Sequence, residues 1–323
     1  MQAILAVTIP FFALVLAGFL AGRQRVLPEA AIPGLNAYVL YFALPCMLFR
    51  FGMNTPVLEL LNPFVLMVYV ACALLVVALT ITVGQRAGVD LKNAAFGALV
   101  AAFPNSGFMG VPLLVSLLGA AAAGPVICSL LADLFVTSSL CIALAQAHGA
   151  AAHGPRTAAL RAVRGALSNP LPWAIALGAA ASITRLRLPG PLDAIVRMLG
   201  DSATPVALFT IGTVLWRAGQ HAHGRTPVGQ YLPVALIKLL VHPALVWAVG
   251  TAARHWGAPL SGFQLTVLVL AAALPCASNV SLLAERYGAD DGRIARIIMS
   301  STVLAFGSFT ALAWWMGVNP AGG

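Results

Sequence analysis

The chain has 323 residues, of which 60% are hydrophobic and only 8% are charged, and its mean hydropathy is +0.94. Soluble domains carry about 25% charged residues, so this composition excludes a soluble enzyme and a disordered scaffold and predicts an all-α polytopic membrane protein. The formal net charge is +9. Because the basic residues lie in short loops between apolar runs, we expect them to contact membrane lipids and expect no nucleic-acid partner.

Apolar runs separated by Pro, Gly and charged residues predict ten transmembrane helices, which we call spans one to ten. In chain order they cover residues 2–21, 32–50, 62–85, 93–118, 121–147, 168–184, 195–217, 229–253, 261–284 and 292–317. At about 20 residues per span, these helices and short connections account for the whole length, so no soluble domain is expected.

Lys and Arg are distributed unevenly between the two sides of this ten-span arrangement. Twelve lie in loops on one side and five on the other, and Lys238 lies inside a span. Cytoplasmic loops carry an excess of Lys and Arg. We therefore expect the side with twelve to be cytoplasmic, both termini to be periplasmic, and residues 148–165 to form the longest cytoplasmic connection.

The two halves of the chain resemble each other at an offset of 160 residues. Aligned pairs include Pro10 with Pro170, Gly18 with Gly178, Pro45 with Pro205, Phe49 with Phe209 and Gly52 with Gly212. Chance identity is the alternative, but the same register in two separate spans counts against it. Five helices per half is an odd number, so the second copy must enter the membrane upside down. This predicts two inverted five-helix repeats, residues 1–147 and 166–323, as in secondary transporters.

Spans four and nine contain clusters of residues that a continuous helix accommodates poorly. Span four reads AAFPNSGFMGVPLL, and span nine reads AAALPCASNVSLLAERYG, with Pro275 aligned on Pro104 at an offset of 171. Proline lacks the helical N–H and glycine is a weak helix former, so both spans are expected to break there. Backbone groups freed inside a membrane need protein or water partners, so we expect the breaks to cross in the middle of the protein. Ordinary proline kinks are the alternative.

The expected crossing offers hydrogen-bond donors that suit an anion. The N-termini of half-helices carry partial positive charge and free N–H groups, and the nearby side chains are neutral amides and hydroxyls. Neither break contains a carboxylate, which counts against a cation site. The predicted substrate-binding residues are Pro104, Asn105, Ser106, Gly107, Pro275, Ser278 and Asn279.

Two ionisable residues lie inside spans, where a charge is costly unless it is paired or functional. Asp133 in span five is a candidate to carry a coupling proton or to pair with Lys238 in span eight. Lys238 is also a candidate to attract the anion. A purely structural ion pair, or Lys238 reaching a membrane interface, is the alternative.

Acidic and basic side chains alternate around the start of span ten. Because opposite charges neighbour each other in a predicted cytoplasmic loop, we expect them to balance one another on a solvated face. They are Glu285, Arg286, Asp290, Asp291, Arg293 and Arg296.

The sequence lacks the motifs of common enzymes. It contains no H-E-x-x-H, G-x-S-x-G or G-x-x-x-x-G-K-[ST] pattern, and its five Cys and six His residues do not follow metal-binding spacings. We therefore expect no enzymatic activity, no cofactor, no metal ion and no direct use of ATP.

The segments LNAYVLYFALPCMLF, PNSGFMGVPLL and LPCASNVSLLAERYGAD, from spans two, four and nine, resemble the auxin efflux carrier family, and the likeness covers essentially the whole chain. This resemblance implies ten helices in inverted repeats with crossing broken helices four and nine. It also implies a scaffold of spans one, two, six and seven that forms a homodimer, and a mobile transport unit of spans three to five and eight to ten that moves as an elevator. It places the substrate carboxylate near Asn105 and, less directly, near Asn279.

The resulting functional prediction is a bacterial inner-membrane carrier for a small organic anion. The expected substrate is a mono- or dicarboxylate such as malonate, or an auxin-like acid. The implied fold is shared with bile acid sodium symporters, so a sodium-coupled symporter is one alternative. A membrane sensor that binds the anion without moving it is another.

Overall fold

The computed structural model describes residues 1–56, 60–146, 167–221 and 226–320, and this part of the chain is all-helical. The predicted cytoplasmic connection, residues 148–165, lies outside the described residues. In chain order the elements are α1 (Gln2–Arg23), η1 (Glu29–Ala31), α2 (Ile32–Tyr38), η2 (Val39–Ala43), α3 (Leu44–Asn54), α5 (Pro63–Arg86), α6 (Leu91–Ala102), η3 (Ser106–Gly110), α7 (Val111–Leu118), η4 (Ala120–Ala122), α8 (Ala123–Ala132), η5 (Asp133–Thr137), α9 (Ser138–Gln146), α11 (Pro170–Ile183), α12 (Gly190–His221), α13 (Val228–Leu236), η7 (Ile237–Val241), α14 (His242–His255), α15 (Gly262–Ala272), α16 (Val280–Arg286) and α17 (Asp291–Trp315).

Seven helical segments of the described residues are long and apolar enough to cross a membrane. They fall in predicted spans one, two, three, five, seven, eight and ten: Gln2–Arg23, Glu29–Asn54, Pro63–Arg86, Ala120–Gln146, Gly190–Gln220, Val228–His255 and Asp291–Trp315. Predicted spans four, six and nine consist of shorter apolar helices. The 12 residues of α6 rise only about 18 Å, less than the roughly 30 Å of a bilayer core, so half of a broken span cannot cross alone.

Two helices begin at an Asn–Pro pair for the same physical reason. The side chain of Asn62 accepts hydrogen bonds from the N–H groups of Phe64 and Val65 at the start of α5. Asn169 does the same for Leu171 at the start of α11. The proline that follows each Asn occupies the first helical position, where the missing N–H costs nothing. These residues therefore fix where predicted spans three and six start.

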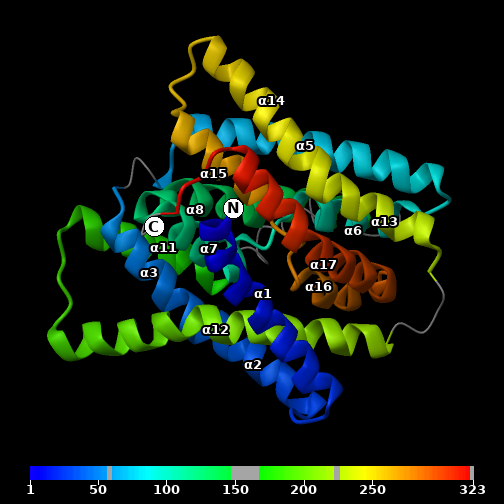
Figure 1. Ribbon diagram of the computed structural model, residues 1–323, viewed down its shortest axis with the longest axis horizontal. Helices are drawn as coiled ribbons and strands as arrows, with labels where there is room; N and C mark the ends of the chain where they lie inside the picture. Colours follow the sequence, from blue (N-terminus) through cyan, green and yellow to red (C-terminus); the bar gives the residue numbers. More distant parts are fainter. Residues whose placement is uncertain (57–59, 147–166, 222–225, 321–323) are drawn as a thin grey trace.

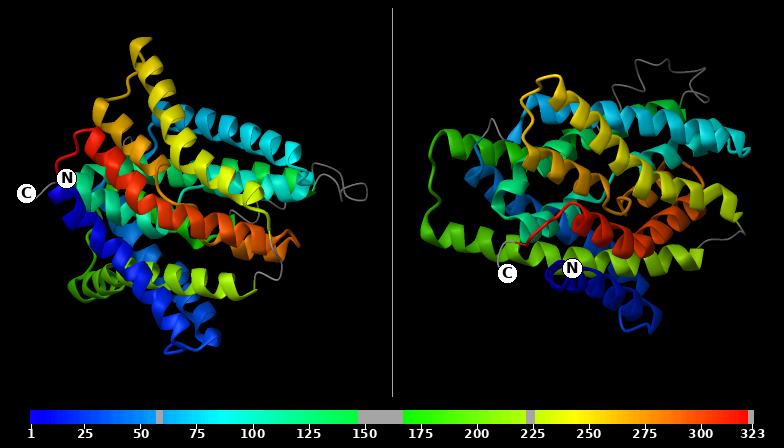
Figure 2. Two further views of the ribbon diagram at one scale, coloured as in Figure 1. Left: turned by 45° about the vertical axis from the view of Figure 1, so that its right-hand side comes forward. Right: turned by 45° about the horizontal axis from the view of Figure 1, so that its top comes forward.

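The helices form two outer groups with the broken spans between them. On one side α1 and α3 pack against α12, and α3 also packs against α11. On the opposite side α5 packs against α14. Figures 1 and 2 both show α12 with α1 and α2 at one edge of the molecule, and α5 with α14 at the other. Helices α6, α7 and α15 lie between these groups (Figure 1).

The close approach of α1 to α12 is repeated in the approach of α11 to α3. A Cβ atom added to Gly18 would lie 1.9 Å from the carbonyl oxygen of Phe209. A Cβ atom added to Gly178 would lie 2.4 Å from the carbonyl oxygen of Phe49. These glycines, and these phenylalanines, are pairs aligned at the 160-residue offset. Equivalent residues of the two halves therefore make equivalent helix contacts, which only glycine permits.

Arg293 is buried, which contradicts the expectation that the charges around span ten all lie on a solvated face. It is only 2% exposed. Its Nε donates to the carbonyl of Gln230 at 2.9 Å, and its Nη1 donates to the carbonyl of Asn93 at 2.9 Å. Gly97 leaves room for the guanidinium group, because a Cβ atom there would lie 3.0 Å from Nη2. The carbonyl bonds offset the cost of burying the charge and tie α17 to α6 and α13.

We expect Arg293→Lys to lower the melting temperature of the purified protein. Lysine keeps the charge but offers one compact ammonium, which cannot reach both carbonyls, and a lost hydrogen bond to a charged group costs about 1.5–3 kcal/mol. Arg286→Lys is the matched control, because Arg286 is exposed in the same region. Equal melting temperatures for the two variants would show that the buried guanidinium does not hold these helices together.

Candidate functional site

The breaks in spans four and nine contact each other in the interior of the protein. The first covers residues 103–105, between α6 and η3, and the second covers residues 273–279, between α15 and α16. Pro104 and Cys276 form an antiparallel bridge between the two non-helical segments. The expectation that both spans are broken and that their breaks meet is therefore confirmed.

The freed backbone groups of one break are satisfied by the other break. The N–H of Asn105 donates to the carbonyl of Pro275 at 2.9 Å, and the N–H of Ala277 donates to the carbonyl of Phe103 at 3.1 Å. Moreover, α6 packs against α16 and α7 packs against α15, so the first half of each broken span lies beside the second half of the other. This is the arrangement of two chain segments that run in opposite directions past each other.

Four of the predicted site residues bring polar side chains to this meeting point. Asn105, Ser106 and Ser278 are buried, and Asn279 is half-buried. The Ser106 hydroxyl has no hydrogen-bond partner among the described residues. The side chains of Asn105 and Asn279 do not cap the helices that they precede. The amides of Asn105 and Asn279 and the hydroxyl of Ser106 therefore do not form helix-capping hydrogen bonds and are available to a ligand.

The other three predicted residues contribute backbone. The carbonyl of Pro275 accepts from Asn105, and the carbonyl of Pro104 accepts from the N–H of Ser106 at 2.7 Å. Gly107 lies in η3, where a Cβ atom would make an ordinary contact of 3.7 Å with Leu130, so space does not require glycine there.

The two half-helices that follow the breaks differ in length. The segment Ser106–Leu118 forms a continuous apolar helix, whereas α16 covers only Val280–Arg286, about two turns. Sequence reasoning treated the two N-termini as equivalent. Because aligned peptide dipoles sum along a helix, the longer segment supplies the more useful N-terminus.

Asp133 lies in the π-helical turn η5 and is held by two neutral donors. The Tyr69 hydroxyl donates to Oδ2 at 2.8 Å, and the Thr137 hydroxyl donates to Oδ1 at 3.0 Å. Asp133 and Tyr69 are fully buried. Tyr69 was not among the residues predicted from the sequence. It could have been found as the one phenol in an otherwise apolar predicted span, because a buried tyrosine hydroxyl needs a hydrogen-bond partner.

Lys238 is fully buried in the π-helical turn η7 and contacts the end of α15. Its Nζ donates to the carbonyl of Ala272 at 2.8 Å and lies 3.3 Å from Nδ1 of His242. The alternative that Lys238 reaches a membrane interface is therefore wrong. Lys238 and Asp133 both belong to the described part of the chain and form no direct ion pair there. The second ring nitrogen of His242, Nε2, is buried and has no partner within the described residues.

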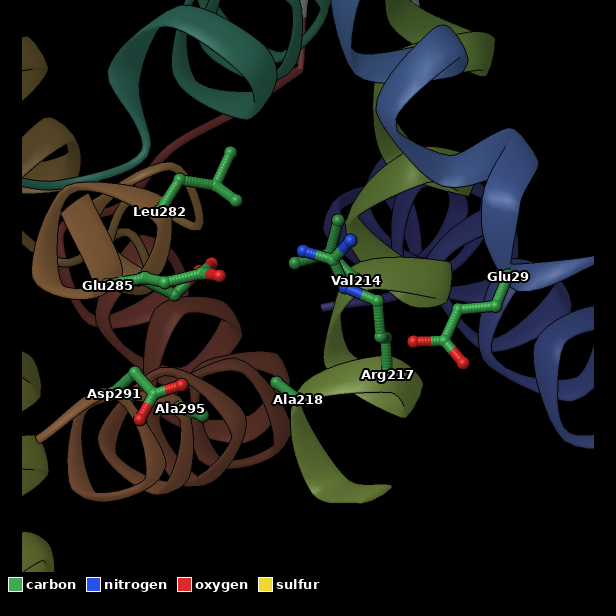
Figure 3. A pocket seen from close by; sticks show the side chains of 9 residues that line it. Glu29, Val214, Arg217, Ala218, Leu282, Glu285, Asp291 and Ala295 are labelled. Carbon is green, nitrogen blue, oxygen red and sulfur yellow. The ribbon is translucent and has the colours of Figure 1, made fainter. Parts of the chain in front are cut away.

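A cavity of about 170 Å³ lies between α12 and the pair α16 and α17. Figure 3 shows Arg217 and Glu29 on one wall and Glu285 and Asp291 on the other. Ser281, two residues after Asn279, also lines it, so the cavity reaches the chain that follows the second break. Its lining carries more carboxylates than guanidinium groups, which disfavours a carboxylate ligand in the cavity itself.

The apolar helices and the buried polar meeting point define a multi-pass integral membrane protein. A family profile described as "Membrane transport protein" matches residues 3–314. The chain therefore belongs to this family of membrane transporters, which confirms the resemblance to auxin efflux carriers. Membership in a transporter family points away from enzymatic activity.

Curated relatives match over nearly their whole lengths. A "Putative malonate transporter" of Rhizobium meliloti is 29% identical over 317 residues, which cover 97% of this chain and 96% of that protein. The "Uncharacterized transporter YfdV" of Escherichia coli is 24% identical over 293 residues, covering 86% and 87%. An "Uncharacterized transporter" of Methanothermobacter thermautotrophicus is 24% identical over 305 residues, covering 94% of each chain.

Proposed function

We propose that the protein is a secondary transporter of a small organic anion, and that a carboxylate of the anion binds where the two helix breaks meet. The observation that carries this proposal is the pairing of Pro104 with Cys276, which brings both breaks together in the interior. Asn105 and the Ser106 hydroxyl, which has no hydrogen-bond partner in the described part of the chain, then offer neutral donors beside the N-terminus of the segment Ser106–Leu118. Such an N-terminus is a ready anion site.

A short dicarboxylate such as malonate is the substrate we propose first. The name of the relative from Rhizobium meliloti supports this choice, and the site's neutral amides and hydroxyls suit any carboxylate. An auxin-like monocarboxylate belongs to the same chemical class.

We propose further that residues 1–147 and 166–323 form two inverted five-helix repeats within ten spans. The equivalent contacts of Gly18 with Phe209 and of Gly178 with Phe49 support this plan. In this proposal α1, α2, α3, α11 and α12 form a fixed scaffold and homodimer interface in the lipids of a bacterial inner membrane, with both termini periplasmic. The other helices carry the site across the membrane as an elevator.

Thermal unfolding of the purified protein with a series of carboxylates tests the binding step. A ligand that binds only the folded state at 100 times its dissociation constant adds about 2.7 kcal/mol of stability. We expect malonate to raise the melting temperature and a neutral diamide of the same size to leave it unchanged. Equal effects of the acid and the diamide would refute an anion site.

Counterflow of labelled malonate in proteoliposomes tests transport. We expect vesicles preloaded with unlabelled malonate to accumulate the label transiently, because a carrier exchanges substrate across the membrane and a sensor does not. Comparing sodium with choline buffer in the same vesicles separates the sodium-coupled alternative. Equal rates are the expected result, and counterflow that stops in choline would establish sodium coupling instead.

A further inference from the structure

We propose that the Lys238 ammonium is the counter-ion of the bound carboxylate and that Asp133 takes up one proton when the carboxylate binds. Carboxylate and proton would then cross the membrane together. This inference rests on the proposed function and assigns its driving ion.

The position of Lys238 places a positive charge at the break of span nine. The last carbonyls of a helix have no partner within the helix and carry partial negative charge, and Nζ of Lys238 binds one of them, the carbonyl of Ala272. Ala272 precedes Pro275 by three residues, and Lys238 is within electrostatic range of Cys276, whose backbone forms the bridge to span four. A carboxylate at the crossing therefore meets the field of this ammonium.

The surroundings of His242 show that this region has unused hydrogen-bonding capacity. Its Nδ1 faces the Lys238 ammonium at 3.3 Å, so Nδ1 accepts a hydrogen bond and Nε2 carries the ring proton. That Nε2 has no partner among the residues described, although the ring is fully buried. The backbone of Ala101, near the end of α6 and two residues before the first break, interacts with this ring, so His242 lies close to the crossing.

Asp133 is placed to change its charge when the carboxylate arrives. Burial disfavours its ionised form, whereas the hydrogen bonds that it accepts from Tyr69 and Thr137 and the charge of Lys238, which forms no direct ion pair with it, favour that form. The titratable groups that face this cluster are Tyr69 and Cys72 from α5, Cys141 from α9, Cys276 from the break, Lys238 from η7 and His242 from α14.

Charge balance inside the membrane links the two events. With Asp133 ionised, the cluster of Asp133 and Lys238 carries no net charge. A bound monocarboxylate would add one negative charge, and the malonate dianion two, in a region where uncompensated charge is costly. One proton from the water on the open side, bound to an Asp133 oxygen, compensates one of these charges, so a monocarboxylate crosses in a neutral cluster and malonate crosses with one net negative charge. The same proton leaves Asp133 on the other side when the carboxylate dissociates.

Titration calorimetry of malonate into the purified protein tests this inference. The binding heat is measured at one pH in Hepes and in Tris, whose different ionisation enthalpies reveal how many protons are taken up. We expect about one proton per bound malonate in the native protein and none in Asp133→Asn. A native value of zero overturns the inference, and so does a proton that persists in Asp133→Asn.

Tyr69→Phe is the matched control, because it removes a donor from the same carboxyl group and keeps the carboxyl. We expect Tyr69→Phe to take up about one proton per bound malonate, with the midpoint of this proton uptake at a different pH from that of the native protein. Size-exclusion profiles establish whether each variant is folded, and a native value of zero overturns the inference whether or not Asp133→Asn folds.

Proteoliposomes with an internal pH dye separate this inference from the proposed function. We expect malonate entry to acidify the lumen of native vesicles. Malonate counterflow without any acidification would refute the coupled proton and leave the transporter standing. Absence of counterflow itself would refute the proposed function.

Discussion

Asn105→Ala is expected to weaken malonate binding by about tenfold to a hundredfold, since a hydrogen bond to a charged group contributes about 1.5–3 kcal/mol. The Asn105 backbone already pairs with Pro275, so the exchange removes the amide side chain and leaves the meeting of the two breaks intact. Because this side chain caps no helix, the melting temperature without ligand should hardly change. The dissociation constant from calorimetry and counterflow in proteoliposomes are the measurements.

Two other asparagines serve as comparisons. Asn54→Ala is the matched control, since Asn54 is exposed and donates to the carbonyl of Arg50, one turn away. It should bind and transport malonate like the native protein. Asn279→Ala should have a smaller effect than Asn105→Ala, because Asn279 is only half-buried. Undiminished malonate binding and counterflow in Asn105→Ala would remove this residue from the site.

Gly18→Ala and Gly212→Ala should each destabilise the protein by on the order of 3 kcal/mol or more, at the upper end of overpacking effects. A Cβ atom on Gly18 would lie 1.9 Å from the carbonyl oxygen of Phe209, and one on Gly212 would lie 1.9 Å from that of Val15. Both obstacles are backbone atoms, which cannot rotate away as a side chain does, so α1 and α12 must separate. Melting temperatures in one detergent measure the effect.

Gly219→Ala is the control for this prediction. Gly219 lies on the same helix, α12, and a Cβ atom there would meet nothing within 4 Å. Alanine is the better helix former by about 1 kcal/mol, so this variant should be as stable as the native protein or slightly more stable. If Gly18→Ala melts at the same temperature as Gly219→Ala, the close contact of α1 with α12 does not contribute to stability.

Local sequence was sufficient to predict the breaks. Pro104, Asn105 and Gly107 remove N–H groups or weaken the helix within a few residues, and Pro275 does the same in span nine. The inverted-repeat pattern, together with the need of freed backbone groups for protein or water partners, also predicted that the two segments would meet. The difference in length between the two half-helices that follow the breaks was not predicted.

Contacts between distant parts of the chain were beyond sequence reasoning. Its charged neighbours in the sequence made Arg293 look like one member of a solvated cluster. Its carbonyl partner on Asn93 is 200 residues away in the chain and could not be foreseen. Lys238 and Asp133 were expected to interact with each other or with the anion. Instead, the partners of Lys238 include the carbonyl of Ala272, Asp133 is held by Tyr69, and no direct ion pair joins Lys238 to Asp133 among the described residues. A backbone carbonyl has no sequence signature, so such partners become visible only in three dimensions.

An experimental structure with malonate bound tests the central claim most directly. We expect ligand density at the bridge between Pro104 and Cys276, with one carboxylate within hydrogen-bond distance of the Asn105 amide and the Ser106 hydroxyl. Density confined to the cavity beside Arg217, or broken spans that do not meet, would contradict it.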